Sequence, residues 1–159
     1  NGSIMRLAPV PMMYRLMPEQ AAHYAAESSR TTHGAPDAVA GCKLFAHYLF
    51  AARAGKTTAE TLAAGQSVDG LSDPIRAIAL WAFAHSTSFA EGALLAVNLG
   101  GDTDTIAAVY GQLAGAHYGI LGIPAHWHEQ IVLHDVIHDT AMELYKLSEV
   151  MPQLDSTRK

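Results

Sequence analysis

Residues 36–55 read PDAVAGCKLFAHYLFAARAG, and this stretch decides the fold class. Pro36 suits the first turn of a helix, where its missing amide proton is not needed, and Gly55 suits a C-terminal stop. The residues between them, Phe45 and Leu49 included, are mostly apolar on every side. A helix that is apolar all round is buried among other elements. The stretch therefore predicts a buried helix packed between neighbours.

Alanine-rich runs of the same kind recur along the chain between Gly and Pro residues, while the alternation typical of strands is nearly absent. The sequence therefore predicts an all-α fold and one domain over residues 1–159. The other helices are expected over residues 19–28, 58–64, 74–85 and 88–98, from 102–105 onward, and over 133–151. Gly111 and Gly115, four residues apart, should let a neighbouring helix approach closely.

The start of the helix at residue 88 carries a specific signal. Ser88 and Glu91 have the S-x-x-E spacing of a capping box, in which each side chain accepts a hydrogen bond from a free amide of the other residue. A polar loop is expected over residues 29–34, after the helix of residues 19–28, and a polar tail is expected after Met151.

Composition excludes several classes of protein. The chain has 159 residues, of which 50% are hydrophobic, so a substantial core is expected. A net charge of -5 without a basic cluster argues against direct binding in a nucleic-acid groove. The single cysteine, Cys42, lies in an apolar run, which predicts a buried thiol and a cytoplasmic setting. No apolar run reaches the roughly 18 residues of a membrane span.

The most informative stretch is residues 99–105, LGGDTDT, in which two carboxylates and a hydroxyl precede an alanine-rich helix. Hard divalent cations prefer oxygen ligands, and Asp102, Asp104 and Thr105 can supply them to one point. The alternative is N-capping, for which Asp and Thr are also preferred. A haloacid-dehalogenase motif is disfavoured because a helix rather than a strand precedes it. An EF-hand lacks its further ligands here.

Four segments in order resemble the ADP-ribosylglycohydrolase family. Residues 98–105, NLGGDTDT, resemble the family's C-terminal metal signature, and residues 1–9, NGSIMRLAP, resemble its G-N-G-S-x-M-R segment. Residues 29–33, SRTTH, resemble its S-x-x-T-H loop, and residues 118–127, YGILGIPAHW, resemble the segment after the metal helix. The resemblance implies a compact orthogonal bundle of helices of that family's type.

The resemblance implies two Mg²⁺ or Mn²⁺ ions, with Asp102, Asp104 and Thr105 as ligands and Asp104 bridging both ions. Asp102 and Asp104 are expected to be essential for a metal-dependent hydrolysis. The bond cleaved would join ADP-ribose to a modified protein or to a small acceptor. The sequence leaves the acceptor, the proton donor and the choice between Mg²⁺ and Mn²⁺ open.

Two further segments are expected to bind substrate by the same resemblance. Asn1, Gly2 and Ser3 would form a glycine loop around ADP-ribose, although an ordinary turn is the alternative. Residues Ser29, Thr32 and His33 would shape the substrate end of the cleft, although a loop bonded to its own backbone is the alternative.

One departure from the family is clear. The family draws its remaining metal ligands from a T-D-D motif in its N-terminal half, and this chain contains no Asp-Asp pair. Together with the start at Asn1, this predicts the C-terminal portion of such an enzyme, with an N-terminal segment cleaved, separate or lost. A non-catalytic ADP-ribose-binding or structural relative is the alternative function, and a helical scaffold without ADP-ribose affinity is a third.

Nine histidines are many for this length. His134 and His138 are spaced for one helix face, as zinc ligands often are, and His126 with His128 forms an H-x-H pattern. Because no further ligand is required by the spacing, surface or capping histidines are favoured over a zinc site.

Overall fold

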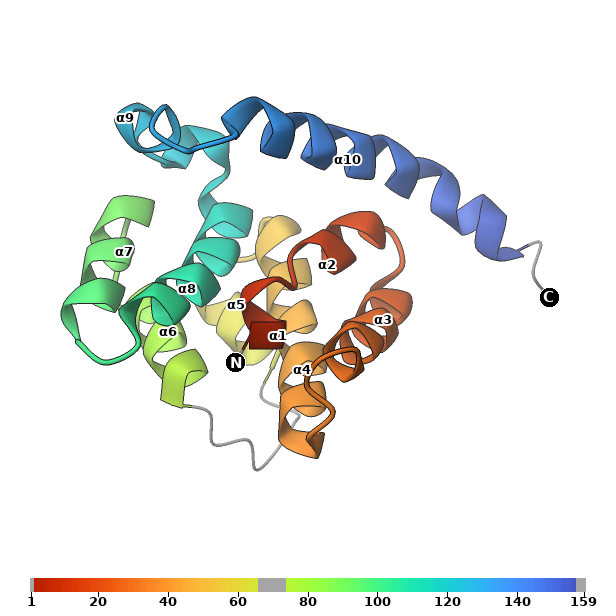
Figure 1. The fold of residues 1–159 in the computed structure, drawn as a ribbon, viewed down its shortest axis with the longest axis horizontal. Coiled ribbons are helices and arrows are strands. Elements are labelled where there is room, and N and C mark those ends of the chain that lie inside the picture. Colours follow the sequence, from red (N-terminus) through yellow and green to blue (C-terminus); the bar gives the residue numbers. More distant parts are fainter. Residues whose placement is uncertain (1, 66–73, 157–159) are drawn as a thin grey trace.

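The computed structural model describes residues 2–65 and 74–156, and in these ranges the chain is helical without strands (Figure 1). This confirms the all-α class. The helices are α1 (Gly2–Met5), α2 (Pro9–Met13), α3 (Pro18–Arg30), α4 (Pro36–Arg53), α5 (Thr58–Ala63), α6 (Pro74–Ala84), α7 (Phe89–Asn98), α8 (Thr103–Tyr118), the 3₁₀ turn η1 (Ile120–Gly122), α9 (Ala125–His128) and α10 (His134–Ser156).

The core lies between α4 and α8, which pack against each other. Helix α4 also packs on α3, and α8 also packs on α6 and α7, so both helices are covered on several sides. Phe45, Val109, Tyr110 and Leu113 are fully buried there. The all-round apolarity of residues 36–55 is therefore explained by the position of α4 at the centre of the bundle.

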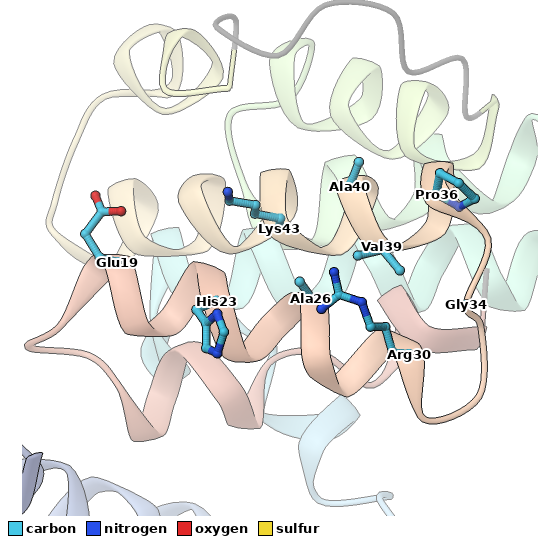
Figure 2. A pocket seen from close by; sticks show the side chains of 9 residues that line it. All are labelled: Glu19, His23, Ala26, Arg30, Gly34, Pro36, Val39, Ala40 and Lys43. Atoms are coloured by element: carbon cyan, nitrogen blue, oxygen red, sulfur yellow. The ribbon is translucent and has the colours of Figure 1, made fainter. Parts of the chain in front are cut away.

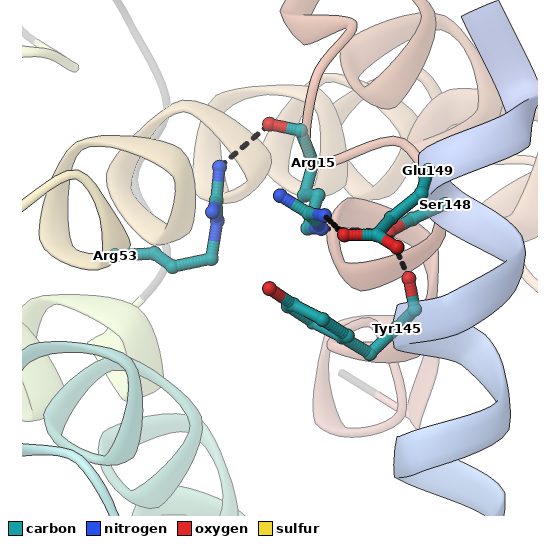
Figure 3. A network of polar contacts seen from close by, with 5 residues as sticks. All are labelled: Arg15, Arg53, Tyr145, Ser148 and Glu149. Carbon is teal, nitrogen blue, oxygen red and sulfur yellow. Dashed lines mark hydrogen bonds and ion pairs between the residues drawn. The ribbon is translucent and has the colours of Figure 1, made fainter.

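Helix α10 runs along one side of the bundle, at the top of Figure 1, and α2 is its main partner. Arg15, between α2 and α3, fastens it (Figure 3). The Arg15 guanidinium donates hydrogen bonds to Ser148 Oγ at 2.7 Å and to Glu149 Oε1 at 3.0 Å. It also lies 4.3 Å from the centre of the Tyr145 ring. On the other side, Arg53 donates a hydrogen bond to the Arg15 carbonyl oxygen at 2.6 Å.

The predicted stops at both ends of α4 are confirmed. Pro36 is its first residue, and Gly55, two residues beyond its end, has a φ of +74°, which glycine adopts without steric cost. The N-cap of α7 is Ser88, as predicted, and its Oγ accepts from Glu91 N at 3.2 Å. The prediction that the Glu91 side chain would accept in return from the Ser88 amide was wrong. The Glu91 carboxylate accepts instead from Thr87 N at 2.7 Å.

The expected close approach at Gly111 and Gly115 was also wrong. No described atom lies within 4 Å of a Cβ placed on either residue. The space beside Gly115 belongs to a pocket of about 270 Å³ that residues of α2, α4 and α8 line. Close packing occurs instead at Gly92 in α7, where a Cβ would come within 2.1 Å of Tyr110 Oη, and at Gly65, where it would come within 2.1 Å of the Tyr48 ring.

The first residues of the chain differ most from expectation. Gly2 and Ser3, expected in a loop, lie in helix α1, and Asn1 is outside the described residues. Tertiary contacts explain this short helix, because Gln112 Nε2 on α8 donates to the carbonyl oxygens of Ile4 at 2.9 Å and Met5 at 3.0 Å. These carbonyl groups at the helix end would otherwise lack a partner within α1.

Smaller differences concern the ends of helices. Helix α3 continues to Arg30, so Ser29 belongs to a helix rather than to the loop that follows it. Helix α10 continues to Ser156, and the tail after it is outside the described residues, as are Ser72 and Asp73. Within the described ranges, no helix combines the length and the apolar composition that crossing a membrane requires.

Candidate functional site

The predicted metal ligands lie where α7 turns into α8. Helix α7 ends at Asn98, and Gly100 and Gly101 both adopt a φ of +78°. Two consecutive left-handed residues are accessible to glycine without the clash that a Cβ would cause. They reverse the chain within a few residues, and α8 begins at Thr103.

The Asp102 side chain at this turn is not used for capping. Asp102 occupies the N-cap position of α8, but its side chain accepts no cap hydrogen bond from the described helix. The capping alternative is therefore wrong for Asp102. Hydrogen bonding to Asp102 holds the pKa of Asp104 below its usual value, and the backbone amides of Thr105 and Asp104 add to this effect. Both aspartates are exposed, whereas Thr105 is buried at the first turn of α8.

This arrangement fits part of a divalent cation site. Asp102 and Asp104 place two carboxyl groups in contact beside the positive end of a helix. Such oxygens are the ligands that Mg²⁺ and Mn²⁺ prefer. Within the described ranges, however, no three His, Cys, Asp or Glu side chains are gathered so that they could hold a metal ion. A cation held at this turn would therefore need its remaining ligands from water or from further polypeptide.

A second cluster joins the predicted substrate-binding residues. Ser29 Oγ lies 3.0 Å from both Ser3 Oγ and the carbonyl oxygen of His33. The Cys42 thiol lies 3.4 Å from Ser3 Oγ. A Cβ on Gly2 would lie 3.0 Å from the His33 ring, so the imidazole covers the start of α1. Residues 26 to 39 positions apart in the sequence thus meet at one point.

Arg6 organises this cluster, and no role was predicted for it. Its Nη2 atom lies 2.7 Å from Thr32 Oγ1, 3.2 Å from Thr31 Oγ1 and 3.1 Å from the Ser28 carbonyl oxygen. Thr32 Oγ1 in turn lies 2.8 Å from His33 Nδ1. Arg6 was within the N-G-S-x-M-R segment quoted from the sequence, and that resemblance was the available signal.

A pocket of about 610 Å³ opens between α3 and α4, beside the loop that ends this cluster (Figure 2). Arg30 reaches into it from α3, and Lys43 lines it from α4. Its lining also includes Glu19, His23 and Gly34. None of the side chains expected to bind substrate lines this pocket, so it is separate from the cluster around Ser29.

The predicted site residues therefore form two groups. Gly2, Ser3, Ser29, Thr32 and His33 meet at the start of α1, and Asp102, Asp104 and Thr105 meet at the start of α8. The two groups are carried by elements that touch, because α1 packs against both α3 and α8.

The histidines at the α9–α10 junction form a row on the surface. The rings of His128 and His134 stack with centres 5.9 Å apart, and those of His134 and His138 with centres 6.3 Å apart. His134 Nδ1 lies 3.0 Å from Asp135 Oδ1, and His138 Nδ1 lies 3.4 Å from Asp139 Oδ1. These contacts occupy one nitrogen of the His134 and His138 rings with a neighbouring carboxylate.

Comparison with known proteins decides the family. The model of the ADP-ribosylglycohydrolase family matches residues 1–76 and 67–153. The chain belongs to the ADP-ribosylglycohydrolase family. A solved structure described as an ADP-ribosylglycohydrolase-related protein complex shares its fold with a TM-score of 0.85 and 37% sequence identity. That match covers 93% of this chain and 60% of the other, and it supports the predicted type of helical bundle.

Among curated members of the family, the ADP-ribosylarginine hydrolase Tri1 of Pseudomonas putida is 35% identical over 179 residues. The match covers 98% of this chain and 48% of that protein. The ADP-ribosyl-[dinitrogen reductase] glycohydrolase of Rhodospirillum rubrum is 29% identical, with 80% of this chain and 49% of that protein covered. This ADP-ribosylglycohydrolase chain thus spans about half the length of the curated relatives it matches.

Proposed function

We propose that this chain provides the α7–α8 turn as a cation-binding half-site, and the α1–α3 cluster as an ADP-ribose-binding surface, of a metal-dependent ADP-ribosyl hydrolase. The observation that carries the proposal is the pair of carboxyl groups at Asp102 and Asp104, which lie together and are exposed, while the Asp102 side chain makes no cap hydrogen bond. Two adjacent carboxylates repel each other unless a cation or a proton lies between them.

The roles follow from the chemistry of these groups. Asp102, Asp104 and the Thr105 hydroxyl would hold Mg²⁺ or Mn²⁺, whose positive charge orients ribose hydroxyls and stabilises negative charge that develops nearby. In the reaction, the hydroxyl of a water molecule goes to the anomeric carbon of the ribose while its proton goes to the departing acceptor. The Asp104 carboxylate, with its lowered pKa, is ionised at neutral pH and accepts hydrogen bonds from water.

For the substrate, we propose ADP-ribose attached to an arginine side chain of a protein. The support is the name of two relatives that match at least 93% of this chain, the ADP-ribosylarginine hydrolases of Pseudomonas putida and Serratia proteamaculans. Thr32 and His33 would contact ADP-ribose through their hydroxyl and imidazole groups, which Arg6 holds in place. Ser3 and Ser29 are buried, so they would support this surface from beneath instead of touching the ligand.

Titration of the purified chain with Mn²⁺, followed by electron paramagnetic resonance, tests the cation-binding half-site. We expect D102N and D104N each to weaken Mn²⁺ binding by at least roughly tenfold, because each removes one of two anionic ligands. D135N is the matched control, since Asp135 is an exposed carboxylate on α10. Mn²⁺ binding of the same affinity in D102N, D104N and the wild type would contradict the proposal.

The alternative is a relative that binds ADP-ribose without cleaving it, and the presence of only two described carboxylates at the turn favours it for this chain alone. Two measurements on one sample separate the possibilities. Calorimetry with ADP-ribose reports binding, and release of free ADP-ribose from ADP-ribosylated arginine in the presence of Mn²⁺ reports hydrolysis. Release that D104N abolishes supports the enzyme, whereas binding without release supports the alternative.

A further inference from the structure

The pocket of about 270 Å³ beside Gly115 lies between α2, α4 and α8. Gly115 follows Thr105 by ten residues on α8, so about 15 Å of helix separate the pocket from the α7–α8 turn. None of the residues proposed to hold a cation or to contact ADP-ribose lines it. The proposed function therefore leaves this pocket without a role.

Small and apolar groups form most of the pocket wall. No described atom lies within 4 Å of a Cβ placed on Gly115, so the missing side chain leaves this space empty. Apolar surface of this kind favours hydrocarbon over water. An apolar cavity of about 150 Å³ can hold benzene, so by proportion about 270 Å³ can hold roughly ten non-hydrogen atoms. The apolar part of the lining consists of Ala8, Pro11, Met12, Leu49, Gly115 and Ala116.

Two polar side chains complete the lining, Gln112 and Arg53. The Gln112 amide is already engaged. Its Oε1 atom accepts from Ala8 N at 2.7 Å, and its Nε2 atom donates to the carbonyl oxygens of Ile4 at 2.9 Å and Met5 at 3.0 Å. Arg53 is therefore the lining residue that can interact with a polar group of a ligand.

Arg53 carries a charge that no described carboxylate neutralises. Its Nη2 atom donates to the Arg15 carbonyl oxygen at 2.6 Å (Figure 3), and its guanidinium lies 5.3 Å from the centre of the Phe50 ring. A guanidinium has five N–H donors, so donors remain for a further acceptor. Burial and the neighbouring charge of Arg15 lower the pKa of Arg53. Both effects disfavour the charged form, and a bound anion would offset them.

We propose that the pocket beside Gly115 binds a small carboxylic acid, with its hydrocarbon body against α2 and α8 and its carboxylate paired with the Arg53 guanidinium. The planar guanidinium matches a carboxylate, because two parallel hydrogen bonds can form between them. A ligand with a polar body would lose hydrogen bonds to water in this apolar space. Binding requires neither a cation nor ADP-ribose, so it holds or fails independently of the proposed function.

A second pocket provides an internal comparison. It has about 360 Å³, shares Ala8 and Met12 with the pocket beside Gly115, and lies between α2 and α10. No charged side chain lines this second pocket. A neutral apolar molecule fits either pocket, whereas the pocket beside Gly115 alone offers a cation to a carboxylate. Preference for a carboxylate therefore identifies the occupied pocket.

Isothermal titration calorimetry of the full 159-residue chain with octanoate and with 1-octanol tests the charge. Octanoate has ten non-hydrogen atoms, and 1-octanol has the same hydrocarbon chain without a charge. We expect octanoate to bind at least roughly tenfold more tightly, because charge-assisted hydrogen bonds are available to the carboxylate alone. R53Q should abolish this preference, whereas R53K, which keeps the charge, should retain part of it.

A change of shape tests the position. G115L fills the pocket and should weaken octanoate binding by at least roughly tenfold. G111L is the matched control, since Gly111 also lies on α8 in open space but does not line the pocket. Far-ultraviolet circular dichroism checks that all variants keep their helices.

Four results would overturn the proposal: no measurable binding of octanoate, equal affinities for octanoate and 1-octanol, a preference that R53Q leaves unchanged, or equal weakening by G115L and G111L. Octanoate binding that G115L does not affect would also contradict it, because the ligand would then occupy the pocket between α2 and α10.

Discussion

Gly92 lies where helix α7 crosses the hydroxyl end of Tyr110. The Tyr110 hydroxyl donates to the Phe89 carbonyl oxygen at 3.0 Å, and burial raises the pKa of Tyr110 to about 12, so the phenol remains neutral. A Cβ at residue 92 would lie 2.1 Å from this hydroxyl and 2.5 Å from Ser86 Oγ. The absence of a side chain is therefore a packing requirement.

We expect G92A to lower the free energy of unfolding by about 1 to 3 kcal/mol, because the buried Tyr110 ring must move to admit a methyl group. Urea denaturation followed by circular dichroism measures this change. G111A is the matched control in α8. Open space surrounds residue 111, so the higher helix propensity of alanine should raise the free energy of unfolding by up to about 1 kcal/mol. Equal destabilisation by both variants would show that helix packing does not distinguish the two sites.

Arg6 provides a second test at this scale. Its guanidinium bonds to Thr32 Oγ1, Thr31 Oγ1 and the Ser28 carbonyl, so R6A removes several hydrogen bonds that hold the loop before His33. We expect the affinity for ADP-ribose to fall roughly tenfold, since each lost hydrogen bond to a charged group is worth about 1.5 kcal/mol or more. Isothermal titration calorimetry measures it. R30A should leave the affinity unchanged, because Arg30 lines the separate pocket between α3 and α4, and an equal loss in R30A would contradict this role for Arg6.

Parts of the site that are local in sequence could be predicted, and parts assembled by tertiary contacts could not. The Asp102–Thr105 stretch contains its carboxylates within three positions, so spacing alone brought them together. The contact between Ser3 and Ser29 joins residues 26 positions apart, and only the family resemblance indicated it. That Asp102 does not cap α8 depends on side-chain orientation, which residue type does not determine.

Several polar groups that hold helix α10 to the bundle converge on Arg15 (Figure 3). The Arg15 side chain is 13% exposed, and it bonds to Ser148 and Glu149 while lying over Tyr145. Its backbone carbonyl is bonded to Arg53 in turn. One side chain thus connects α10 to the α2–α3 connection and, through it, to α4.

We expect R15A to accelerate amide exchange across residues 141–151 several-fold, because the hydrogen bonds and the ring contact that fasten α10 are lost together. Hydrogen exchange followed by mass spectrometry measures the rates. R30A is the control here also, since Arg30 pairs with Glu27 on the surface of one helix and such pairs contribute about 0 to 1 kcal/mol. Unchanged exchange in R15A would mean that apolar contacts with α2 alone hold the helix.

The N-terminal cap of α5 predicts a dependence of stability on pH. Thr57 and Glu60 form a capping box, and hydrogen bonds from the Thr57 backbone and hydroxyl hold the pKa of Glu60 below 4.5 in the folded state. A lowered folded pKa means that the stabilisation is fully present above the unfolded pKa and is lost as pH falls through the folded pKa. E60Q should therefore flatten the decline in unfolding midpoint below pH 4.5. Thermal unfolding across this range measures it, and parallel pH profiles of E60Q and the wild type would contradict the prediction.

The longer helices could be predicted because each carries its own signals. Pro36 and Gly55 bracket α4, and Gly100 with Gly101 separate α7 from α8. Helices α1 and α2 could not be predicted, since four and five residues are too few for a helical period. Two of the five residues in α2 are prolines, which usually indicate a turn. Both short helices depend on contacts with distant parts of the chain.

At the scale of the whole molecule, the chain has a core of its own. Buried side chains of α4, α6 and α8 fill the centre, while many of the exposed large apolar side chains lie between Ile120 and Leu154. The chain spans about half the length of the relatives it matches, and we expect further polypeptide to supply the remaining ligands of the proposed cation site.

The family and the helical class could be predicted at this scale, because four short motifs occur in the family's order along almost the entire chain. The arrangement of the helices could not, since it depends on which faces pack together. The Gly111 and Gly115 spacing shows this limit. Four-residue spacing of glycines indicates a surface that a helix can approach, but within the described ranges no helix approaches these residues.

The Gln112 side chain sets an order of events during folding. It accepts a hydrogen bond from Ala8 N at 2.7 Å and donates to the carbonyl oxygens of Ile4 and Met5, which are 108 and 107 positions away. During synthesis, residues 4–8 are made about a hundred residues before Gln112. At about 5 to 20 residues per second, they wait roughly 5 to 20 seconds for this partner. These residues are therefore made well before they can become fixed in place.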